Sequence, residues 1–357
     1  MTPELTVDLQ AVCANWRLLA EVHGGPTAAV VKANAYGLGA AAVAPALLAA
    51  GARHFFVAQL SEAVALRPLL PGAVICVLNG FSVAEAGAYA VFDLTPALGA
   101  LPEIVAYQAF ARQVGRALPA LLHVDTGMNR LGLGAGELAA VVADVSLLAG
   151  IDWRYAMTHL VSAELPEDPV NAAQRARLAA ACAALPSMGR SLANSSGIFL
   201  GAAFRSDLAR PGAALYGVNP TPGRPNPMRP TVRLTAPVLQ VRDIAAGETV
   251  GYNASWVAAR PTRVAVVALG YADGYHRAAS GRAQAAFEGA RVNLIGRISM
   301  DLLTFDVTDH RSVVPGSRLE LMGPAVPPDE VAAWAGTNGY EVLTSMGHRA
   351  TRMFGPL

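Results

Sequence analysis

The chain has 357 residues, of which 53% are hydrophobic and 15% are charged. This length predicts two domains or three, with enough apolar residues to fill a large core. The formal net charge is only +1, which argues against nucleic acid or an anionic membrane as a dedicated partner.

Cysteine use and the first residues bear on location. Cys13, Cys76 and Cys182 are widely spaced and odd in number, with no metal pattern and no convincing disulfide framework, which fits a reducing, cytoplasmic location. The first ten residues lack a basic segment followed by an apolar one, so we expect no signal peptide. The uncharged stretch 33–52 is alanine-rich and contains Pro45, and it predicts a buried or amphipathic helix, not a membrane span.

Short apolar runs alternate with helix-like segments over the first two thirds of the chain. The predicted strands lie at 28–31, 54–58, 74–78, 90–94, 120–124, 155–158, 191–193 and 213–216. The segments between them are rich in Ala, Leu, Glu, Gln and Arg, which favour helix. About eight such units over roughly 215 residues predict a (β/α)8 TIM barrel, with a doubly wound open sheet as the alternative. No GxGxxG sequence follows the first strand, which weakens the dinucleotide-binding version of that sheet.

The proline-rich segment 219–230, NPTPGRPNPMRP, marks a junction. Strand-like runs separated by turns follow it at 232–241, 249–252, 263–269, 292–295, 302–307 and 318–321. They predict a mostly-β domain with one short helix at 328–335. We therefore expect a barrel over 9–225 and a β-domain over 226–357, with the strand-like residues 1–8 able to join either.

Lys32 follows the apolar strand 28–31 directly and precedes the glycine-containing sequence ANAYGLG. Burial of an ammonium group disfavours its charged form and lowers its pKa. A neutral amine is what a lysine needs to form an imine with an aldehyde cofactor. The alternative is an ordinary strand-end lysine that reaches solvent, and this segment alone leaves both interpretations open.

Polar residues gather at the predicted carboxyl ends of other barrel strands, where the chemistry of this fold takes place. They are His123, Asp125 and Arg130 after the fifth strand, His159 after the sixth, Asn194, Ser195 and Ser196 after the seventh, and Arg210, Gly212 and Ala213 beside the eighth. Ser195 and the backbone N–H groups of Gly212 and Ala213 would form an anion site where such barrels often bind phosphate. Each residue alone has an ordinary structural explanation, but together they indicate an imine-forming lysine and a phosphate site at one rim.

The motifs VVKANAYG, HVDTGMNRLG, THL, ANSSG, RPGAALYG, GYADGY and GRISMD together resemble those of the alanine racemases, a family of pyridoxal-phosphate enzymes. The resemblance runs from about residue 4 to about residue 354, and the lysine motif, GYADG and SMD are specific in combination. It implies a (β/α)8 barrel followed by a β-domain, and a head-to-tail homodimer whose subunits share each active site. It also implies an isomerase that interconverts L- and D-alanine through an external aldimine of pyridoxal 5'-phosphate and supplies D-alanine for cell-wall peptidoglycan.

The resemblance implies two catalytic bases. Lys32 would hold the cofactor as a Schiff base and act on one face of Cα, and Tyr271, from the partner subunit, would act on the other face. A phenol is a poor base at its usual pKa of about 10; in the family, a histidine matching His159 bonds the tyrosine and an arginine matching Arg210. That arginine contacts the pyridine nitrogen and stays protonated, which weakens the cofactor as an electron sink and suppresses decarboxylation and transamination.

Further contacts follow from the same resemblance. Arg130 would contact the cofactor phenolic oxygen and the substrate carboxylate, and the backbone N–H of Met300, from the partner subunit, would face that carboxylate. Asp301 would shape the substrate entrance. The other implied cofactor-binding residues are Tyr36, His159, Asn194, Ser195, Gly212, Ala213 and His348.

Three positions depart from the family pattern. Many members carry a lysine, often carbamylated, at the position of His123, and its carbamate orients the arginine matching Arg130. A histidine cannot be modified in that way, so we expect a bound anion or an acidic side chain to orient Arg130 instead. His348 stands where many members have a phosphate-contacting tyrosine, which would change the width of the entrance. Leu38 replaces a histidine, and we expect this exchange to be neutral for the chemistry.

The sequence leaves three alternatives open: a racemase with broader substrates such as serine or lysine, a pyridoxal-phosphate amino-acid decarboxylase on the same scaffold, and a non-enzymatic carrier of the cofactor. Such decarboxylases tend to place a glutamate at the pyridine nitrogen, where this chain offers Arg210. A carrier built on a lone barrel would lack the β-domain that contains Tyr271. We expect a small amino acid as substrate and no metal.

Overall fold

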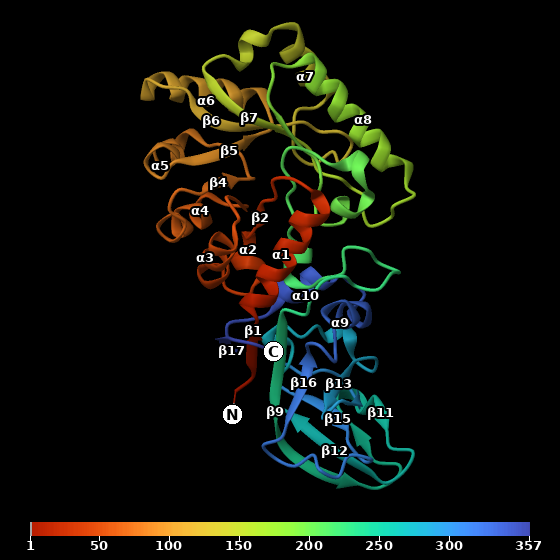
Figure 1. Ribbon diagram of the computed structural model, residues 1–357. Coiled ribbons are helices and arrows are strands. Elements are labelled where there is room, and N and C mark those ends of the chain that lie inside the picture. Colours follow the sequence, from red (N-terminus) through yellow and green to blue (C-terminus); the bar gives the residue numbers. More distant parts are fainter. Residues whose placement is uncertain (1) are drawn as a thin grey trace.

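The computed structural model describes residues 2–357. Figure 1 shows a parallel barrel with its surrounding helices above a mostly-β region, joined by the long strand β9. The predicted fold class, a (β/α)8 barrel followed by a mostly-β domain, is confirmed. In the part of the chain that is described, no helix combines the length and apolar character needed to cross a membrane.

Seven parallel strands form the barrel sheet in the spatial order β2-β3-β4-β5-β6-β7-β8. Their bounds are Ala29–Val30 (β2), His54–Val57 (β3), Val74–Val77 (β4), Leu94–Leu98 (β5), Leu118–His123 (β6), Ile151–Met157 (β7) and Gly189–Ser191 (β8). The helices around them are Leu9–His23 (α1), Ala40–Ala50 (α3), Leu60–Leu66 (α4), Ala86–Val91 (α5), Leu101–Val114 (α6), Ala135–Ala143 (α7) and Pro169–Ala184 (α8). Sequence order equals spatial order, which excludes the doubly wound alternative.

The extended segment 208–211 closes the barrel between β8 and β2. On the β2 side the N–H of Ala28 donates to the carbonyl of Ala209 at 2.8 Å, and the N–H of Val30 donates to Pro211 at 3.0 Å. On the β8 side the N–H of Arg210 donates to the carbonyl of Ala193 at 2.8 Å. These bonds complete the ring that a TIM barrel requires.

Two predicted barrel strands are wrong. The segment 213–216 is a 3-10 helix, η6 (Ala213–Tyr216), which begins after Gly212 and ends at Gly217 with a φ of 85°. The apolar run there marks burial, which does not distinguish a strand from a short helix. The fourth strand is β5, and residues 90–94 instead end α5 and pass through a turn at Asp93, whose φ is 49°.

Side chains from successive strands fill the inside of the barrel. This buried cluster consists of Ala28, Val30, Phe56, Cys76, Ala97, Leu121, Met157 and Leu208. A larger core lies between the sheet and its helices and continues into the β-region. The barrel interior is therefore a packed core, and chemistry is confined to its ends.

The β-region contains an eight-stranded sheet in the order β12-β15-β14-β13-β16-β9-β1-β17, and β12 also pairs with β9. Its strands are Glu4–Val7 (β1), Val232–Ile244 (β9), Thr262–Val267 (β12), Gln284–Phe287 (β13), Ala290–Leu294 (β14), Leu303–Asp306 (β15), Arg318–Met322 (β16) and Thr351–Phe354 (β17). The second pairing of β9 closes a small barrel, because this 13-residue strand bonds to β16 and β1 near its start and to β12 near its end.

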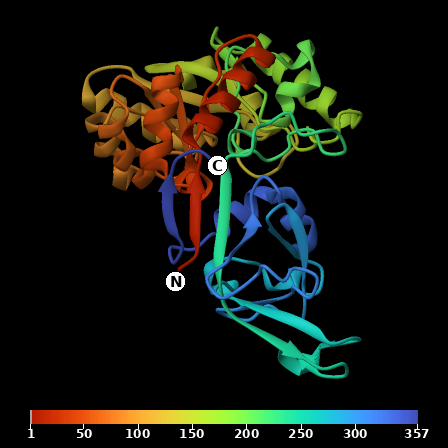
Figure 2. The same cartoon turned by 60° about the horizontal axis from the view of Figure 1, so that its bottom comes forward.

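Both ends of the chain meet in this sheet, since β1 pairs with β9 and runs parallel to β17. Of the predicted N-terminal strand 1–8, Met1 lies outside the described residues. The predicted helix 328–335 is α9 (Pro328–Ala335), and α10 (Gly339–Ser345) follows it. A small hairpin, β10 (Thr249–Val250) and β11 (Trp256–Val257), pairs apart from the main sheet and, in teal, projects from the β-region in Figure 2.

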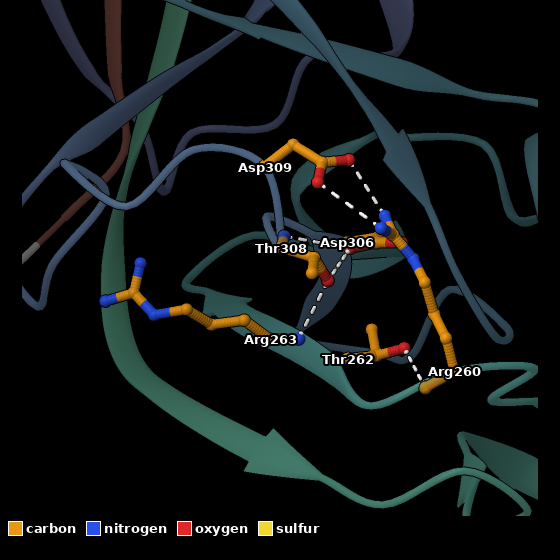
Figure 3. Close-up of polar contacts among 6 residues, drawn as sticks. All are labelled: Arg260, Thr262, Arg263, Asp306, Thr308 and Asp309. Atoms are coloured by element: carbon orange, nitrogen blue, oxygen red, sulfur yellow. Dashed lines mark hydrogen bonds and ion pairs between the residues drawn. The ribbon is translucent and has the colours of Figure 1, made fainter.

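Polar contacts fix the end of the β-region that lies away from the large barrel (Figure 3). The guanidinium of Arg260 donates to both carboxylate oxygens of Asp309, at 3.3 and 2.8 Å. The N–H of Arg263 donates to the Thr308 hydroxyl at 2.9 Å, and that hydroxyl donates to Asp306 at 2.5 Å. These contacts join the start of β12 to the loop after β15.

Candidate active site

A cavity of about 670 Å³ lies at the carboxyl ends of the barrel strands. Its lining includes the following residues that the sequence singled out: Lys32, Tyr36, His123, Arg130, His159, Asn194, Ser195, Ser196, Arg210, Gly212 and Ala213. Because these residues follow different strands, the barrel topology alone brings them together. The volume is within the range of small-molecule sites.

Lys32 begins a turn of unusual backbone conformation, α2 (Lys32–Tyr36). The φ angles of Ala33, Asn34, Ala35 and Tyr36 are 52°, 54°, 54° and 55°, so four successive non-glycine residues are left-handed. Such a conformation costs free energy and persists only where the surroundings hold it. Burial and the nearby charge of Arg130 lower the Lys32 pKa, which favours the nucleophilic amine.

Glu62, in the first turn of α4, holds this turn in place. One carboxylate oxygen accepts from the N–H of Ala33 at 2.6 Å, and the other accepts from the N–H groups of Ala58 and Gln59 at 2.8 and 3.0 Å. The same carboxylate opposes the lowering of the Lys32 pKa. Glu62 therefore joins the segment after β2 to the segment after β3 and adds a negative charge beside the lysine.

The far side of the cavity combines a close backbone approach with backbone donors. A side chain at Gly212 would collide with the Tyr36 hydroxyl, so only glycine admits the tyrosine there. The Ser195 hydroxyl oxygen accepts from the N–H groups of Gly212 and Ala214, at 3.0 and 3.2 Å. Burial also raises the Tyr36 pKa, so its hydroxyl stays protonated.

Arg210 lies at the bottom of the cavity and is only 5% exposed. Its guanidinium donates to the Ser191 hydroxyl and to the Thr158 carbonyl. Burial lowers its pKa to about 10, so it remains charged at neutral pH. Within residues 2–357 no carboxylate forms an ion pair with it, so Arg210 lines the cavity as a positive charge that no side chain neutralises.

Two histidines near Arg210 are held neutral. Burial, followed by the charge of Arg210, lowers the pKa of His159 to about 3 and that of His123 to about 4. Arg130 contributes to both shifts. The cavity therefore has a cationic character that comes from arginine and lysine, with imidazoles that can accept or donate a hydrogen bond without adding charge.

Arg130 lies at the mouth of the cavity on a loop that Asp125 organises. The Asp125 carboxylate accepts from the N–H groups of Gly127 at 2.8 Å, Met128 at 2.9 Å and Asn129 at 3.0 Å. Burial raises the Asp125 pKa, but these three bonds outweigh it and hold the pKa below its ordinary value. Asp125 is thus occupied with the loop backbone, and the described residues include no acidic side chain bonded to Arg130.

Four of the residues that the resemblance implies for the site do not line this cavity: Tyr271, Met300, Asp301 and His348. Tyr271 begins the 3-10 helix η8 (Tyr271–Asp273) in the β-region and is 42% exposed, and Met300 is 53% exposed. The two motifs are nonetheless adjacent, because the N–H of Ala272 donates to the carbonyl of Met300 at 3.0 Å. Residues 270–274, which we call the Tyr271 turn, and the loop 299–301 thus form one surface, separate from the cavity.

Helix α10 lines one side of the cavity, whereas His348, three residues beyond its end, does not line it. The α10 residues Tyr340 and Thr344 line the cavity, and α10 packs against the left-handed turn, since a side chain at Gly37 would meet the carbonyl of Leu343. Sequence reasoning missed Tyr340 and Glu62. Neither belongs to a motif, although the Gln59-to-Glu62 spacing is a helix-start signal.

Comparisons with known proteins agree with this geometry. Residues 7–220 match the family described as alanine racemase, N-terminal domain, and residues 231–354 match alanine racemase, C-terminal domain. The chain belongs to the alanine racemase family. It is accordingly an isomerase, similar over nearly its full length to racemases from several bacteria.

Two curated relatives and two solved structures illustrate the similarity. The alanine racemase of Acidiphilium cryptum is 55% identical over 98% of both chains, and that of Methylobacterium nodulans is 52% identical over 98% of this chain and 95% of its own. The alanine racemase of Bartonella henselae, solved with covalently bound pyridoxal phosphate, has a TM-score of 0.95 at 39% identity over 99% of both chains. The biosynthetic enzyme of Pseudomonas aeruginosa has a TM-score of 0.93 at 34% identity over 99% of both chains.

Proposed function

We propose that this protein interconverts L- and D-alanine, with pyridoxal 5'-phosphate attached covalently to Lys32. The observation that carries the proposal is the meeting of Lys32, buried Arg210 and the Ser195 hydroxyl beside Gly212 in one cavity. The names of the relatives support alanine as the substrate. The bound cofactor of the Bartonella henselae protein supports pyridoxal phosphate.

The residues of the cavity fit this cofactor. The N–H groups of Gly212 and Ala214 donate to the Ser195 oxygen, which leaves the hydroxyls of Tyr36 and Ser195 and the N–H of Ala213 as the donors that would hold a phosphate beside Gly212. Arg210 supplies a permanent charge for a ring nitrogen deeper in the barrel. Asn194, Ala213 and His159 complete the proposed cofactor-binding lining, and Arg130 at the mouth suits a carboxylate or phenolate oxygen. The cofactor-binding role proposed for His348 rests on the resemblance alone, because His348 does not line the cavity.

The bound cofactor would supply an aldehyde for covalent attachment and a ring that withdraws electrons from Cα. Arg210 would donate a hydrogen bond to the ring nitrogen without giving up its proton, because its pKa of about 10 keeps it charged at neutral pH. This limits electron withdrawal, and it favours returning the proton to Cα over decarboxylation. The amine of Lys32 would remove or return that proton on one face of Cα.

The second face needs a second base, for which we propose Tyr271 of the partner subunit. Within one chain, Tyr271 and Met300 lie on an exposed surface outside the cavity. We therefore propose a homodimer in which this surface covers the partner's cavity. There the tyrosine faces Cα, the Met300 N–H faces the substrate carboxylate and Asp301 borders the entrance.

Three further proposals belong to this function. The barrel spans 9–225 and the β-domain 226–357, supported by the pairing of β1 and β17 within the second sheet. The enzyme works in the cytoplasm, which the three unpaired cysteines Cys13, Cys76 and Cys182 favour. Its product, D-alanine, supplies cell-wall peptidoglycan.

Incubation of the purified enzyme and cofactor with L-alanine in D₂O tests the activity. We expect deuterium at Cα and a loss of optical rotation to zero, with Lys32→Ala as the inactive control. Release of carbon dioxide instead would indicate a decarboxylase, and bound cofactor without exchange would indicate a carrier. Parallel assays with serine and lysine test for a broader substrate range.

A further inference from the structure

We propose that Arg349 is a positioning residue for the second base. It ties the Tyr271 turn to the loop 299–301, so that the tyrosine and the Met300 N–H are presented to the partner's cavity as one rigid unit. The inference rests on the proposed function, and it assigns a role to a residue that neither lines the cavity nor forms part of the sequence motifs.

Arg349 bridges two carboxylates that belong to the two motifs. Its Nε lies 3.3 Å from Oδ1 of Asp273, in the Tyr271 turn, and its Nη1 donates to Oδ1 of Asp301 at 2.8 Å. The Asp273 side chain is 4% exposed and that of Asp301 is 54% exposed. One guanidinium with several fixed donors can hold both carboxylates at once, which a single ammonium cannot do with the same geometry.

The buried carboxylate of Asp273 also stabilises the Tyr271 turn itself. The other oxygen of Asp273 accepts from the N–H of Gly270 at 2.9 Å, which closes the turn around Tyr271. Its backbone carbonyl accepts from the N–H of Gly347 at 2.9 Å. A buried carboxylate needs a compensating partner, and Arg349 is the cation that forms an ion pair with it.

The remaining links complete a closed ring of contacts. The N–H of Tyr271 donates to the carbonyl of Ser299 at 3.1 Å, next to the bond between Ala272 and Met300. A side chain at Gly270 would collide with the backbone of residues 299 and 300, so the two segments lie in direct contact. Arg349 closes the ring from the opposite side, through Asp273 and Asp301. Its loss leaves the backbone contacts but frees the turn to shift relative to the loop.

The test measures exchange of the Cα hydrogen from each enantiomer separately. Net conversion is unsuitable because two enantiomers have an equilibrium constant of one, so kcat/KM must fall equally in both directions. Deuterium uptake into unconverted L-alanine and into unconverted D-alanine, each at early times in D₂O, reports the two bases individually. The variants are Arg349→Gln, Arg349→Lys and, as the reference, Tyr271→Phe.

We expect Arg349→Gln to slow exchange by about 10- to 100-fold for the same single enantiomer that Tyr271→Phe affects, because displacement of a catalytic group by about 1 Å has an effect of this size. Arg349→Lys should restore part of that loss. Absorbance of the Lys32-bound cofactor should not change, since Arg349 does not line the cavity of its own chain. Arg260→Gln breaks a similarly exposed arginine–carboxylate pair at the far end of the β-region and should leave both exchange rates unchanged.

The outcomes separate the inference from the function on which it rests. If Tyr271→Phe is selective for one enantiomer but Arg349→Gln is neutral, or slows both enantiomers equally, Arg349 is not a positioning residue. If Tyr271→Phe slows Cα exchange from both enantiomers equally, the assignment of two separate bases is wrong, and with it the proposed function on which the inference rests. If Arg349→Gln does not fold, Asp301→Asn removes only the exposed half of the bridge. This variant must slow Cα exchange from the same single enantiomer, to a smaller degree. If it slows exchange from both enantiomers equally, or from neither, the inference is overturned as well.

Discussion

The cavity of the barrel and the surface formed by the Tyr271 turn and the loop 299–301 differ in nearly every physical respect. Around the cavity, Arg210 is buried, His123 and His159 are held neutral, and Lys32 directly precedes a left-handed turn that only tight surroundings can maintain. On the second surface, Tyr271 and Met300 are 42% and 53% exposed. The contrast favours the proposal that one chain holds the cofactor by itself and that two-sided proton transfer needs Tyr271 of a second subunit.

The largest effect should come from the barrel side. Lys32→Ala removes the amine that we propose as the attachment point of the cofactor and as one of two bases, so we expect racemisation to fall by at least about 10⁴-fold. The absorbance of the covalently attached cofactor should disappear from the purified variant. A variant that keeps this absorbance would show that another residue holds the cofactor.

The next largest effect should come from the exposed surface and should leave the barrel untouched. Tyr271→Phe keeps the ring but removes the hydroxyl, so exchange from one enantiomer should fall by about 10²- to 10⁴-fold. Cofactor absorbance and the stoichiometry of binding should equal those of the unaltered protein. Loss of cofactor in this variant would contradict the separation of the two regions.

A substitution of Glu62 tests how the charges around the cavity set the pKa of Lys32. Glu62→Gln keeps an acceptor for the N–H of Ala33 but removes the charge that opposes the lowered Lys32 pKa. We therefore expect a further lowering of this pKa. Under the proposed mechanism Lys32 is a free amine only after the substrate has displaced it from the cofactor, so the acidic limb of the pH profile of kcat, in the direction in which Lys32 removes the proton, should move to lower pH, with a loss of activity of about 10-fold or less. Glu85→Gln, on the barrel exterior, serves as the matched control and should leave the profile in place.

The smallest effect concerns stability at low pH. The folded pKa of His123 is about 4, below the unfolded value of about 6.5, so the unfolded chain binds more protons below pH 6.5. The free energy of unfolding should therefore fall as the pH drops from about 6.5 to 4, by at most about 1.4 kcal/mol per pH unit from this histidine.

His123→Gln should reduce this slope, and His159 contributes in the same direction because its pKa is about 3. Urea unfolding at pH 7 and pH 5, at one protein concentration, measures the difference. An unchanged slope in the variant would mean that His123 is already charged in the folded protein.

The sequence predicted those parts that follow local periodicity or carry a motif. Lys32 at the end of a strand and the helix 328–335 needed only neighbouring residues. It failed at 213–216, because burial makes a short helix look like a strand. Tyr340 was missed because it enters the cavity from α10, far along the chain, and no local pattern encodes that contact.

The surface around Tyr271 also shows what the sequence cannot reveal. The motif around Tyr271 is recognisable in the sequence, but its distance from the cavity in one chain is a property of the folded molecule. The bridge through Arg349 joins residues 273, 301 and 349, and it becomes visible only when the β-region is assembled.

Mixing two inactive variants tests the shared active site most directly. Lys32→Ala and Tyr271→Phe are each purified, mixed in equal amounts, and allowed to exchange subunits before racemisation of alanine is assayed. If each site takes Lys32 from one subunit and Tyr271 from its partner, half of the dimers are mixed and each contains one intact site, so roughly a quarter of the original activity should return. If the mixture, with subunit exchange verified, remains as inactive as its two components, the two residues do not act across a subunit interface and the account is wrong.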